Sequence, residues 1–360
     1  MIFEYNDPMH RTRDSAVSAA LGAALLFGAS TPLAKLLLAE TRPWMLAGLL
    51  YLGSGCGLWL LRRTRGTPPA RLSAAEWRWL AGAIAAGGVL APVLLMAGLT
   101  RMAAAPVSLL LNAEGVLTAL LAWFAFSEHV DTRIAIGMGA IVAGAGVLGW
   151  PVGGALTGAA AWPALAVLGA CLGWAVDNNL TRKVALADAT WIAMIKGLAA
   201  GVTNLLLALG LGAPLPAPAD VAGASVVGFL CYGTSLSLFV RALRDLGTAR
   251  TGAYFSVAPF FGALLSLVLL GEPVTPSLLA GGLLMGVGVY LHVTEEHVHE
   301  HAHDSIEHEH EHVHGDGDDH HHHPGEEPTP PGTRHRHPHR HEALSHTHGH
   351  YPDAHHQHLH

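Results

Sequence analysis

Long apolar runs follow one another along the first 294 residues. Each spans about 20 residues, enough for a helix rising 1.5 Å per residue to cross the ~30 Å hydrocarbon core of a bilayer. A membrane β-barrel would instead show alternating segments of about ten residues. The pattern predicts an all-α membrane protein with ten transmembrane helices. We expect them at Ala16–Leu38, Pro43–Leu61, Trp79–Leu99, Ala103–Phe126, Arg133–Trp150, Trp162–Leu180, Ala189–Leu209, Val221–Ala242, Thr251–Gly271 and Pro276–Val293.

Composition separates this apolar body from a polar tail. Only 13% of the 360 residues are charged, against roughly 25% in soluble proteins, whereas 23 of the 26 histidines lie after residue 294. We divide the chain into a polar N-terminus (1–15), two five-helix units (16–150 and 151–293) and a His-rich tail (294–360). The body shows no nucleotide-binding, hydrolase or zinc-protease motif and is not basic enough for a nucleic-acid surface. An enzyme and a nucleic-acid partner are therefore not expected.

Basic residues are distributed unevenly between the predicted loops. Thirteen Lys and Arg residues fall on one side of the membrane, whereas the other side carries only Arg42 and Arg101. Because cytoplasmic loops are rich in Lys and Arg, this bias predicts a cytoplasmic N-terminus. Ten crossings then place the C-terminal tail in the cytoplasm as well. We expect an integral protein of the bacterial inner membrane.

The sequence also contains an internal repeat. A shift of 144 residues aligns Val107–Glu128 with Thr251–Glu272, and a shift of 147 places Gly28–Lys35 over Ala175–Arg182. The repeating unit is therefore five helices. Two tandem units of odd helix number lie in opposite senses across the bilayer, which is the inverted-repeat architecture of many secondary transporters. Such a protein binds its substrate near the midplane, between the halves.

The two units resemble the EamA-type repeats of the drug/metabolite transporter superfamily. The resemblance rests on the first-helix stretch from Leu26 to Lys35 and on a fourth helix that ends in Glu128 or Glu272, with Pro259 at a position where the family often has proline. Gly115 departs from that pattern in the first unit. The resemblance implies a ten-helix secondary carrier, usually an exporter or exchanger of small metabolites or drugs. It leaves the substrate open, and it does not extend to the tail.

Charged residues inside the membrane are the first candidates for a site, since each costs about 2.5–3.5 kcal/mol to insert. Glu114 and Lys196 lie near the centres of the fourth and seventh helices, in opposite halves. We expect both to face a central cavity, as a pair, with Asn112 nearby. Glu114 could bind a cationic group or carry a proton. The alternative is a structural pair that fixes the register of the helices.

Further polar candidates occur at repeat-related positions. Asp177, Asn178 and Asn179 cluster in the sixth helix, and their counterpart in the first helix is the stretch Ser30-Thr31-Pro32. Tyr254 and Ser256 in the ninth helix correspond to Leu110 and Asn112. We expect these residues to contact substrate or form gates; the alternative is polar residues satisfied near helix ends. Lys35 and Arg182 are expected as interfacial anchors, and Glu128 and Glu272 as turn and inter-helix pairing residues.

The tail repeats the pattern His-x-His with carboxylates between and almost no large apolar residues, so we expect it to be disordered without a ligand. Neutral imidazole suits Ni²⁺, Zn²⁺, Co²⁺ and Cu²⁺, and several exchangeable sites are expected. The alternative is a pH-responsive or solubilising tail. The candidate ligands are His297, His299, His301, His303, His308, His310, His312, His314, His320, His321, His322, His323, His346, His348, His350, His355, His356, His358 and His360.

Three functions fit this organisation. The first is an exporter of a small metabolite or drug-like solute, with a metal-binding regulatory or buffering tail. The second is an exporter of Ni²⁺, Co²⁺ or Zn²⁺, and the third is a membrane-anchored metal store. The predicted membrane helices contain no histidine or cysteine pair for a soft metal, which favours the first. No cofactor is required; the expected partners are the lipid bilayer, the solute, divalent metal ions and a second copy of the chain in a homodimer.

Overall fold

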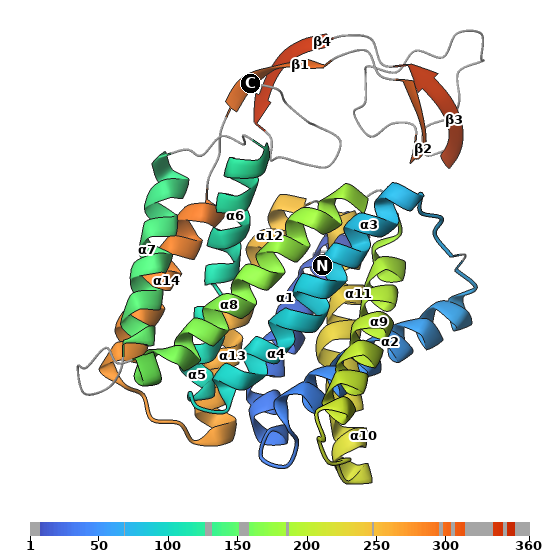
Figure 1. Ribbon diagram of the computed structural model, residues 1–360. Helices are drawn as coiled ribbons and strands as arrows, with labels where there is room; N and C mark the ends of the chain where they lie inside the picture. Colours follow the sequence, from blue (N-terminus) through green and yellow to red (C-terminus); the bar gives the residue numbers. More distant parts are fainter. Residues whose placement is uncertain are drawn as a thin grey trace, which may run out of the picture. The chain divides into compact units, whose positions relative to one another are not determined.

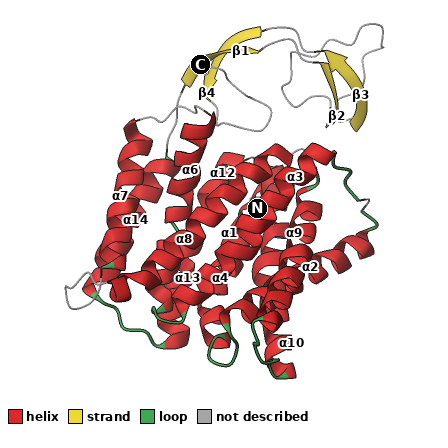
Figure 2. Ribbon diagram, in the orientation of Figure 1, coloured by secondary structure: helices red, strands yellow, loops and turns green. Residues whose placement is uncertain are grey.

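The computed structural model describes residues 8–67, 69–126, 132–150, 158–184, 187–246, 248–294, 298–303, 307–313, 334–340 and 344–349. It divides into two compact units, residues 1–295 and 296–360, which we treat separately. In the described part of the first unit, every secondary-structure element is a helix (Figures 1 and 2). The four strands all belong to the second unit. The chain is thus an all-α membrane protein with an appended tail.

Each of the ten predicted helices is present in the first unit. Nine described segments are long and apolar enough to cross a membrane, and α8, with 24 residues, has the length for the tenth. The first half contains α1 (Pro8–Leu37), α2 (Pro43–Arg65), α3 (Ala74–Ala83), η1 (Ile84–Leu90), α4 (Ala91–Leu99), α5 (Ala104–Leu110), α6 (Ala113–Phe126) and α7 (Thr132–Gly149). The second contains α8 (Gly158–Thr181), η2 (Arg182–Val184), α9 (Ala189–Gly210), α10 (Pro218–Val227), η3 (Gly228–Thr234), α11 (Ser235–Leu246), α12 (Thr248–Phe255), α13 (Ala258–Leu270) and α14 (Pro276–Val293).

Two predicted spans in each half are not regular α-helices. The third and eighth contain the π-helical segments η1 and η3, which are related by the 144-residue shift of the repeat. The fourth and ninth are interrupted between α5 and α6 and between α12 and α13. Pro259 explains the second interruption because it has no amide to continue the helix. At the first, the side-chain amide of Asn112 donates to the carbonyl of Leu109 at 2.9 Å and competes with the helical pattern.

The π-helical turn in η1 has a local cause. The amide of Ala91 donates to the carbonyl of Ala86, five residues back, so the carbonyl of Gly87 loses its ordinary helical donor. Pro92 has no amide to offer the carbonyl of Gly88. Side chains supply the missing donors: Tyr51 and Trp174 donate to Gly87, and Asn204 donates to Gly88 at 3.0 Å.

Glycines bring the helices into backbone contact. A Cβ on Gly55 of α2 would lie 2.5 Å from the amide nitrogen of Leu198 in α9, and one on Gly197 would lie 2.8 Å from the amide nitrogen of Gly55. The α7 and α14 helices pair in the same way, with Gly144 and Gly281 each against the partner helix (Figure 1). Close backbone approach of this kind replaces the hydrophobic drive that is absent between helices in lipid.

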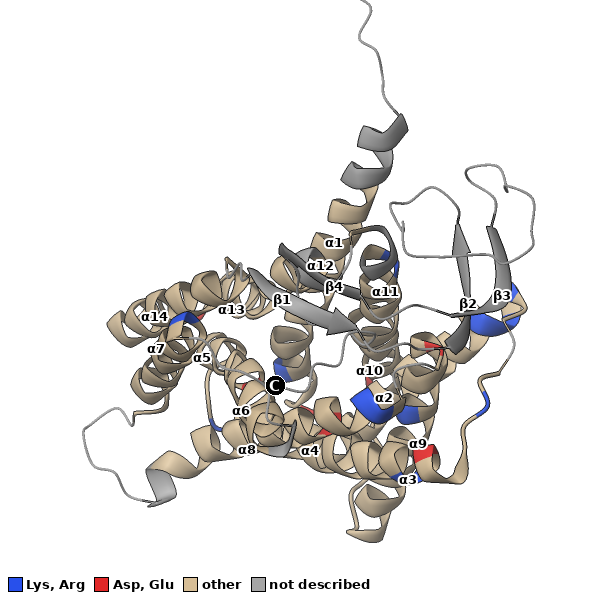
Figure 3. Cartoon of the chain, turned by 90° about the horizontal axis from the view of Figure 1, so that it is seen from above, with Lys and Arg blue, Asp and Glu red and all other residues tan. Residues whose placement is uncertain are grey.

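Charged residues are sparse on the described helices of the body (Figure 3). Two of them hold the connection between α4 and α5. The ammonium of Lys35 donates to the carbonyls of Leu99 and Met102 at 2.5 and 2.8 Å, and the carboxylate of Glu272 accepts from the amides of Ala104 and Ala105 at 2.6 and 2.8 Å. The predicted inter-helix role of Glu272 is therefore confirmed. Glu128 lies outside the described residues.

The tail differs from the expectation of disorder in its described part. Its strands β1 (Val298–His303) and β4 (Leu344–Gly349) pair antiparallel, as do β2 (Glu307–Val313) and β3 (Arg334–Arg340). The period-two alternation of histidine with other residues suits a strand, because successive positions alternate between two faces. Each ladder has only two strands in the described residues, an arrangement that is at best marginally stable in water. The other candidate ligands of the tail fall outside the described residues: His297, His314, His320–His323, His350, His355, His356, His358 and His360.

Candidate substrate cavity

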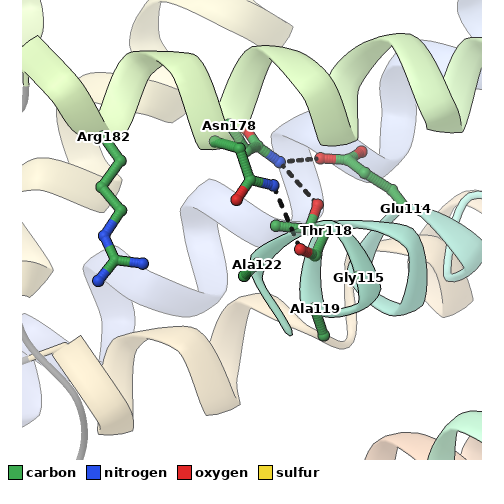
Figure 4. A pocket seen from close by; sticks show the side chains of 8 residues that line it. Glu114, Gly115, Thr118, Ala119, Ala122, Asn178 and Arg182 are labelled. Carbon is green, nitrogen blue, oxygen red and sulfur yellow. Dashed lines mark hydrogen bonds between the residues drawn. The ribbon is translucent and has the colours of Figure 1, made fainter. Parts of the chain in front are cut away.

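A cavity of about 350 Å³ lies between the two halves (Figure 4). The α6 helix of the first half forms one wall, and α8 with η2 of the second half forms the other. The volume falls within the range of 300–1,000 Å³ that is usual for small-molecule sites. Eight residues line the cavity: Glu114, Gly115, Thr118, Ala119, Ala122, Asn178, Asn179 and Arg182.

Glu114 is the acidic group of this cavity. It lies in the first turn of α6, immediately after the interruption that follows α5. Its carboxylate accepts a hydrogen bond from the side-chain amide of Asn178 on α8 at 2.9 Å. In the described part of the chain Glu114 forms no ion pair. The carboxylate is thus held by a neutral donor and faces a space that another molecule can enter.

Thr118 extends the polar wall one turn along α6. Its hydroxyl accepts from the amide of Asn178 at 3.3 Å, and its carbonyl accepts from the amide of Asn179 at 3.2 Å. Figure 4 shows the amide of Asn178 directed at α6 and Arg182 farther along the same wall as Asn178. The two halves of the repeat are therefore joined across this cavity by hydrogen bonds.

The predicted pairing of Glu114 with Lys196 is wrong. The ammonium of Lys196 instead donates to both carboxylate oxygens of Asp177, at 2.5 and 2.7 Å, and to the hydroxyl of Thr181 at 3.3 Å. Thr181 in turn donates to Asp177 at 2.8 Å. The reason is that Lys196 and Asp177 are both largely buried, with side chains 19% and 7% exposed, and a buried ammonium takes an ionised carboxylate within reach.

The remaining candidates lie away from the Glu114 cavity. Thr31 lines a second, much smaller cavity between α1 and α13. Asn112 is buried, with its amide donating to Leu109 and in contact with the sulfur of Met285 at 3.9 Å. Tyr254 packs against a small cluster of buried alanines, and the hydroxyl of Ser256 donates to the carbonyl of Ala253 at 2.7 Å. Of the sequence candidates, Glu114, Asn178 and Asn179 are brought together in this cavity.

The EamA-like transporter family matches the chain twice, at residues 14–150 and 161–294. The chain belongs to this family. An uncharacterized transporter from Methanothermobacter thermautotrophicus is 26% identical over 285 residues, which cover 75% of the chain and 83% of the relative. The chain shares its fold with a protein of known crystal structure, with a TM-score of 0.57 and 19% sequence identity. The match covers 78% of this chain and 96% of the other. The protein is a membrane transporter and not an enzyme.

Sequence reasoning missed an aromatic cluster in this EamA-like transporter, formed by Phe27, Tyr51, Trp174 and Tyr232. Trp174 lies one turn from Asn178 on α8, and its indole donates to the carbonyl of Gly87 at 2.9 Å. The ring of Tyr51 lies 5.9 Å from that of Tyr232, which lies 6.0 Å from that of Phe27. The cluster therefore contains residues from both halves of the repeat. One signal was available in the sequence, because Phe27 and Trp174 are related by the 147-residue shift.

Arg182 adds a cation to the lining of the Glu114 cavity. The sequence predicts an interfacial anchor at this position and does not predict a place in the cavity. Arg182 follows Asn178 by four residues and so lies on the same side of the helix, about 6 Å farther along the axis. The repeat gives the contrast: its counterpart Lys35 is bound to the backbone of the α4–α5 connection.

Proposed function

We propose that this EamA-like transporter is a secondary exporter of a small metabolite or drug-like solute, which binds in the Glu114 cavity. The observation that carries the proposal is a carboxylate without an ion pair in the described residues, in a cavity of about 350 Å³ between the two repeats. A membrane-buried ionisable residue is expensive to insert and marks a transport path. A site between inverted repeats is where carriers of this architecture bind substrate.

We further propose that Glu114 exchanges a proton for the solute. A carboxylate that faces an open cavity and takes a hydrogen bond from the neutral amide of Asn178 can alternate between binding a proton and binding a polar group of the solute. The sequence contains no nucleotide-binding motif, so ion exchange is the energy source that fits. The excess of Lys and Arg on one side of the membrane supports cytoplasmic termini and an inner-membrane location.

The test uses the full chain in proteoliposomes that enclose a pH-sensitive dye. A panel of amino acids, amines, sugars and antibiotics is added one compound at a time, and dye fluorescence reports coupled proton movement. For each compound that gives a signal, Glu114→Gln is expected to abolish it, because the amide cannot carry a proton. Glu40→Gln, which removes a carboxylate that is exposed outside the cavity, is the matched control and keeps the signal. A signal that persists in Glu114→Gln would contradict the assignment.

We propose in addition that the tail binds Ni²⁺, Zn²⁺, Co²⁺ or Cu²⁺ as a regulatory or buffering element. The support is the backbone register of its described strands. Histidine stands opposite histidine at five positions: His299 with His348, His301 with His346, His308 with His339, His310 with His337 and His312 with His335. Directly opposite positions of an antiparallel ladder lie about 4.5–5.5 Å apart, which suits two imidazoles on one ion.

The experiment that separates a metal-binding tail from a metal exporter compares two chains. Full-length protein and protein ending at Thr294 are titrated with Ni²⁺ and assayed for Ni²⁺, Co²⁺ and Zn²⁺ flux in everted vesicles. Loss of Ni²⁺ binding with no flux in either chain supports a tail that regulates or buffers. Flux of any of these metals that Glu114→Gln abolishes would instead establish the exporter of divalent metals.

A further inference from the structure

A second cavity, which we call the Ser108 cavity, lies between α1, α5 and α13. Its volume is only about 10 Å³, close to the space of a single water molecule. Seven residues line it: Phe27, Gly28, Thr31, Ser108, Leu111, Ala258 and Pro259. None of these residues lines the Glu114 cavity, and Phe27 alone also belongs to the aromatic cluster.

The repeat relates this cavity to the Glu114 cavity. The 144-residue shift carries Glu114 and Gly115 on α6 onto Ala258 and Pro259 on α13, and the 147-residue shift carries Thr31 on α1 onto Asn178 on α8. In each of these three pairs, one residue lines the Glu114 cavity and its repeat counterpart lines the smaller cavity. The Ser108 cavity is therefore the counterpart of the Glu114 cavity, and the two differ in volume, about 10 Å³ against about 350 Å³, and in these lining residues.

Backbone contact closes the smaller cavity. A Cβ on Gly28 would lie 2.4 Å from the carbonyl oxygen of Ala258 and 2.9 Å from the amide nitrogen of Gly262, and one on Gly262 would lie 2.8 Å from the carbonyl oxygen of Gly28. In the Glu114 cavity, a Cβ on Gly115, the counterpart of Pro259, would have no atom within 4 Å. The α1 and α13 helices thus touch through their backbones, whereas α8 and α6 meet through the side-chain hydrogen bonds of Asn178 and Asn179 and leave the Glu114 cavity between them.

Ser108 gives the closed cavity an unused polar group. The residue is 1% exposed, and its hydroxyl has no hydrogen-bond partner among the described residues. A buried hydroxyl left without a partner costs about 1–3 kcal/mol. This cost is explained if the cavity opens in another state of the transporter. In that state the hydroxyl of Ser108 can form hydrogen bonds with water or with the solute.

Lys35 and Glu272 form a clamp that attaches α1 and the residues after α13 to the connection between α4 and α5. Both bind the backbone of this connection. Lys35 is the repeat counterpart of Arg182, which lines the open cavity. The clamp therefore joins the two helices that close the Ser108 cavity to one shared connection.

We propose that the Ser108 cavity is a second half-site on the solute path, which opens on the Lys35–Glu272 side when the Glu114 cavity closes. The proposal rests on the transport function above. The half-site offers the hydroxyls of Ser108 and Thr31 and has Ala258 where the other has Glu114, so it binds hydrogen-bonding groups of the solute without a carboxylate. A solute that passes from one to the other loses its contact with an acidic group.

Cysteine labelling tests the proposal without any substrate. In a Cys56→Ser background, Ser108→Cys and Thr118→Cys are each exposed to a membrane-impermeant maleimide in right-side-out and in everted vesicles. We expect the two cysteines to be labelled from opposite faces, with Ser108→Cys the slower. Labelling of both from the same face, or no labelling of Ser108→Cys from either face, would overturn the proposal.

A second set of variants shifts the equilibrium between the closed and the open form of the Ser108 cavity. Gly28→Ala places a methyl group where Ala258 lies and should raise the labelling rate of Ser108→Cys about tenfold, or about 1.4 kcal/mol in favour of the open form. Gly146→Ala on α7, with nothing within 4 Å, is the control and leaves the rate unchanged. Glu272→Gln weakens the clamp and should act in the same direction; it decides the matter if Gly28→Ala does not fold. An unchanged rate in the folded variants overturns the proposal.

The two proposals fail separately. If Glu114→Gln abolishes proton-coupled transport but the labelling faces coincide, the second half-site is wrong and the transport proposal stands. If labelling behaves as expected but Glu114→Gln still exchanges protons for solute, the role of Glu114 is wrong and the second half-site stands.

Discussion

Breaking the ion pair between Asp177 and Lys196 should destabilise the protein far more than removing the whole pair. Two unit charges whose centres are about 4 Å apart attract by about 4 kcal/mol at an effective dielectric constant of about 20. Both side chains are largely buried, so each has also lost hydration worth several kcal/mol. The gain and the cost nearly cancel in the intact pair. Removing one partner leaves the cost of the other uncompensated.

We therefore expect Asp177→Asn and Lys196→Met each to lower the free energy of unfolding by about 3 kcal/mol, near the lower end of values for buried pairs. The double variant should lie within about 1 kcal/mol of the wild type. The nine tryptophans allow unfolding to be followed by fluorescence during an SDS titration in mixed micelles. Glu40→Gln, exposed and outside the pair, is the control. A double variant as unstable as the sum of the two single variants would refute this reasoning.

Two further predictions concern helix ends and helix contacts. Burial alone would raise the pKa of Asp188, but hydrogen bonds at the start of α9 and the guanidinium of Arg62 outweigh it and hold that pKa below its usual range. Asp188 therefore stabilises the fold above about pH 4 and loses that contribution as the pH falls further. Asp188→Ala should lower the free energy of unfolding by about 1 kcal/mol at neutral pH. On acidification, the unfolding curves of this variant should change less than those of the wild type. Gly55→Ala should lower the free energy of unfolding by about 1–3 kcal/mol, because its Cβ would lie 2.5 Å from the amide of Leu198, whereas Gly146→Ala should be neutral in the same SDS titration.

Hydropathy and the internal repeat predict the membrane architecture from sequence because both depend on long segments. A run of apolar residues must be a helix in lipid, where every backbone polar group needs an internal partner. The match of Val107–Glu128 to Thr251–Glu272 then fixes the size of the repeating unit. The same repeat places Glu272 correctly at a helix–helix junction, where it binds the amides of Ala104 and Ala105.

The details of the site depend on shorter-range effects that hydropathy does not report. The interruption before Glu114 follows from one side-chain hydrogen bond of Asn112, and the π-helical turn of η1 from a one-residue shift of the bonding pattern. Which carboxylate binds Lys196 depends on the reach of a long side chain and the packing of α8. For these reasons the sequence could identify Glu114, Asp177 and Lys196 as charges inside the membrane but could not assign their partners.

The inequality of the two cavities follows from the residues that break the repeat. If the halves were identical in sequence, the form with one cavity open and the form with the other open would have equal free energies. Ala258 in place of Glu114 and Thr31 in place of Asn178 remove this equality, because the hydrogen bond that joins α6 to α8 has no counterpart between α1 and α13. A difference of a few kcal/mol is enough to leave the minor form at a small percentage. The substitutions between repeat counterparts, rather than the residues the halves share, are therefore the ones we expect to determine which cavity is open at rest.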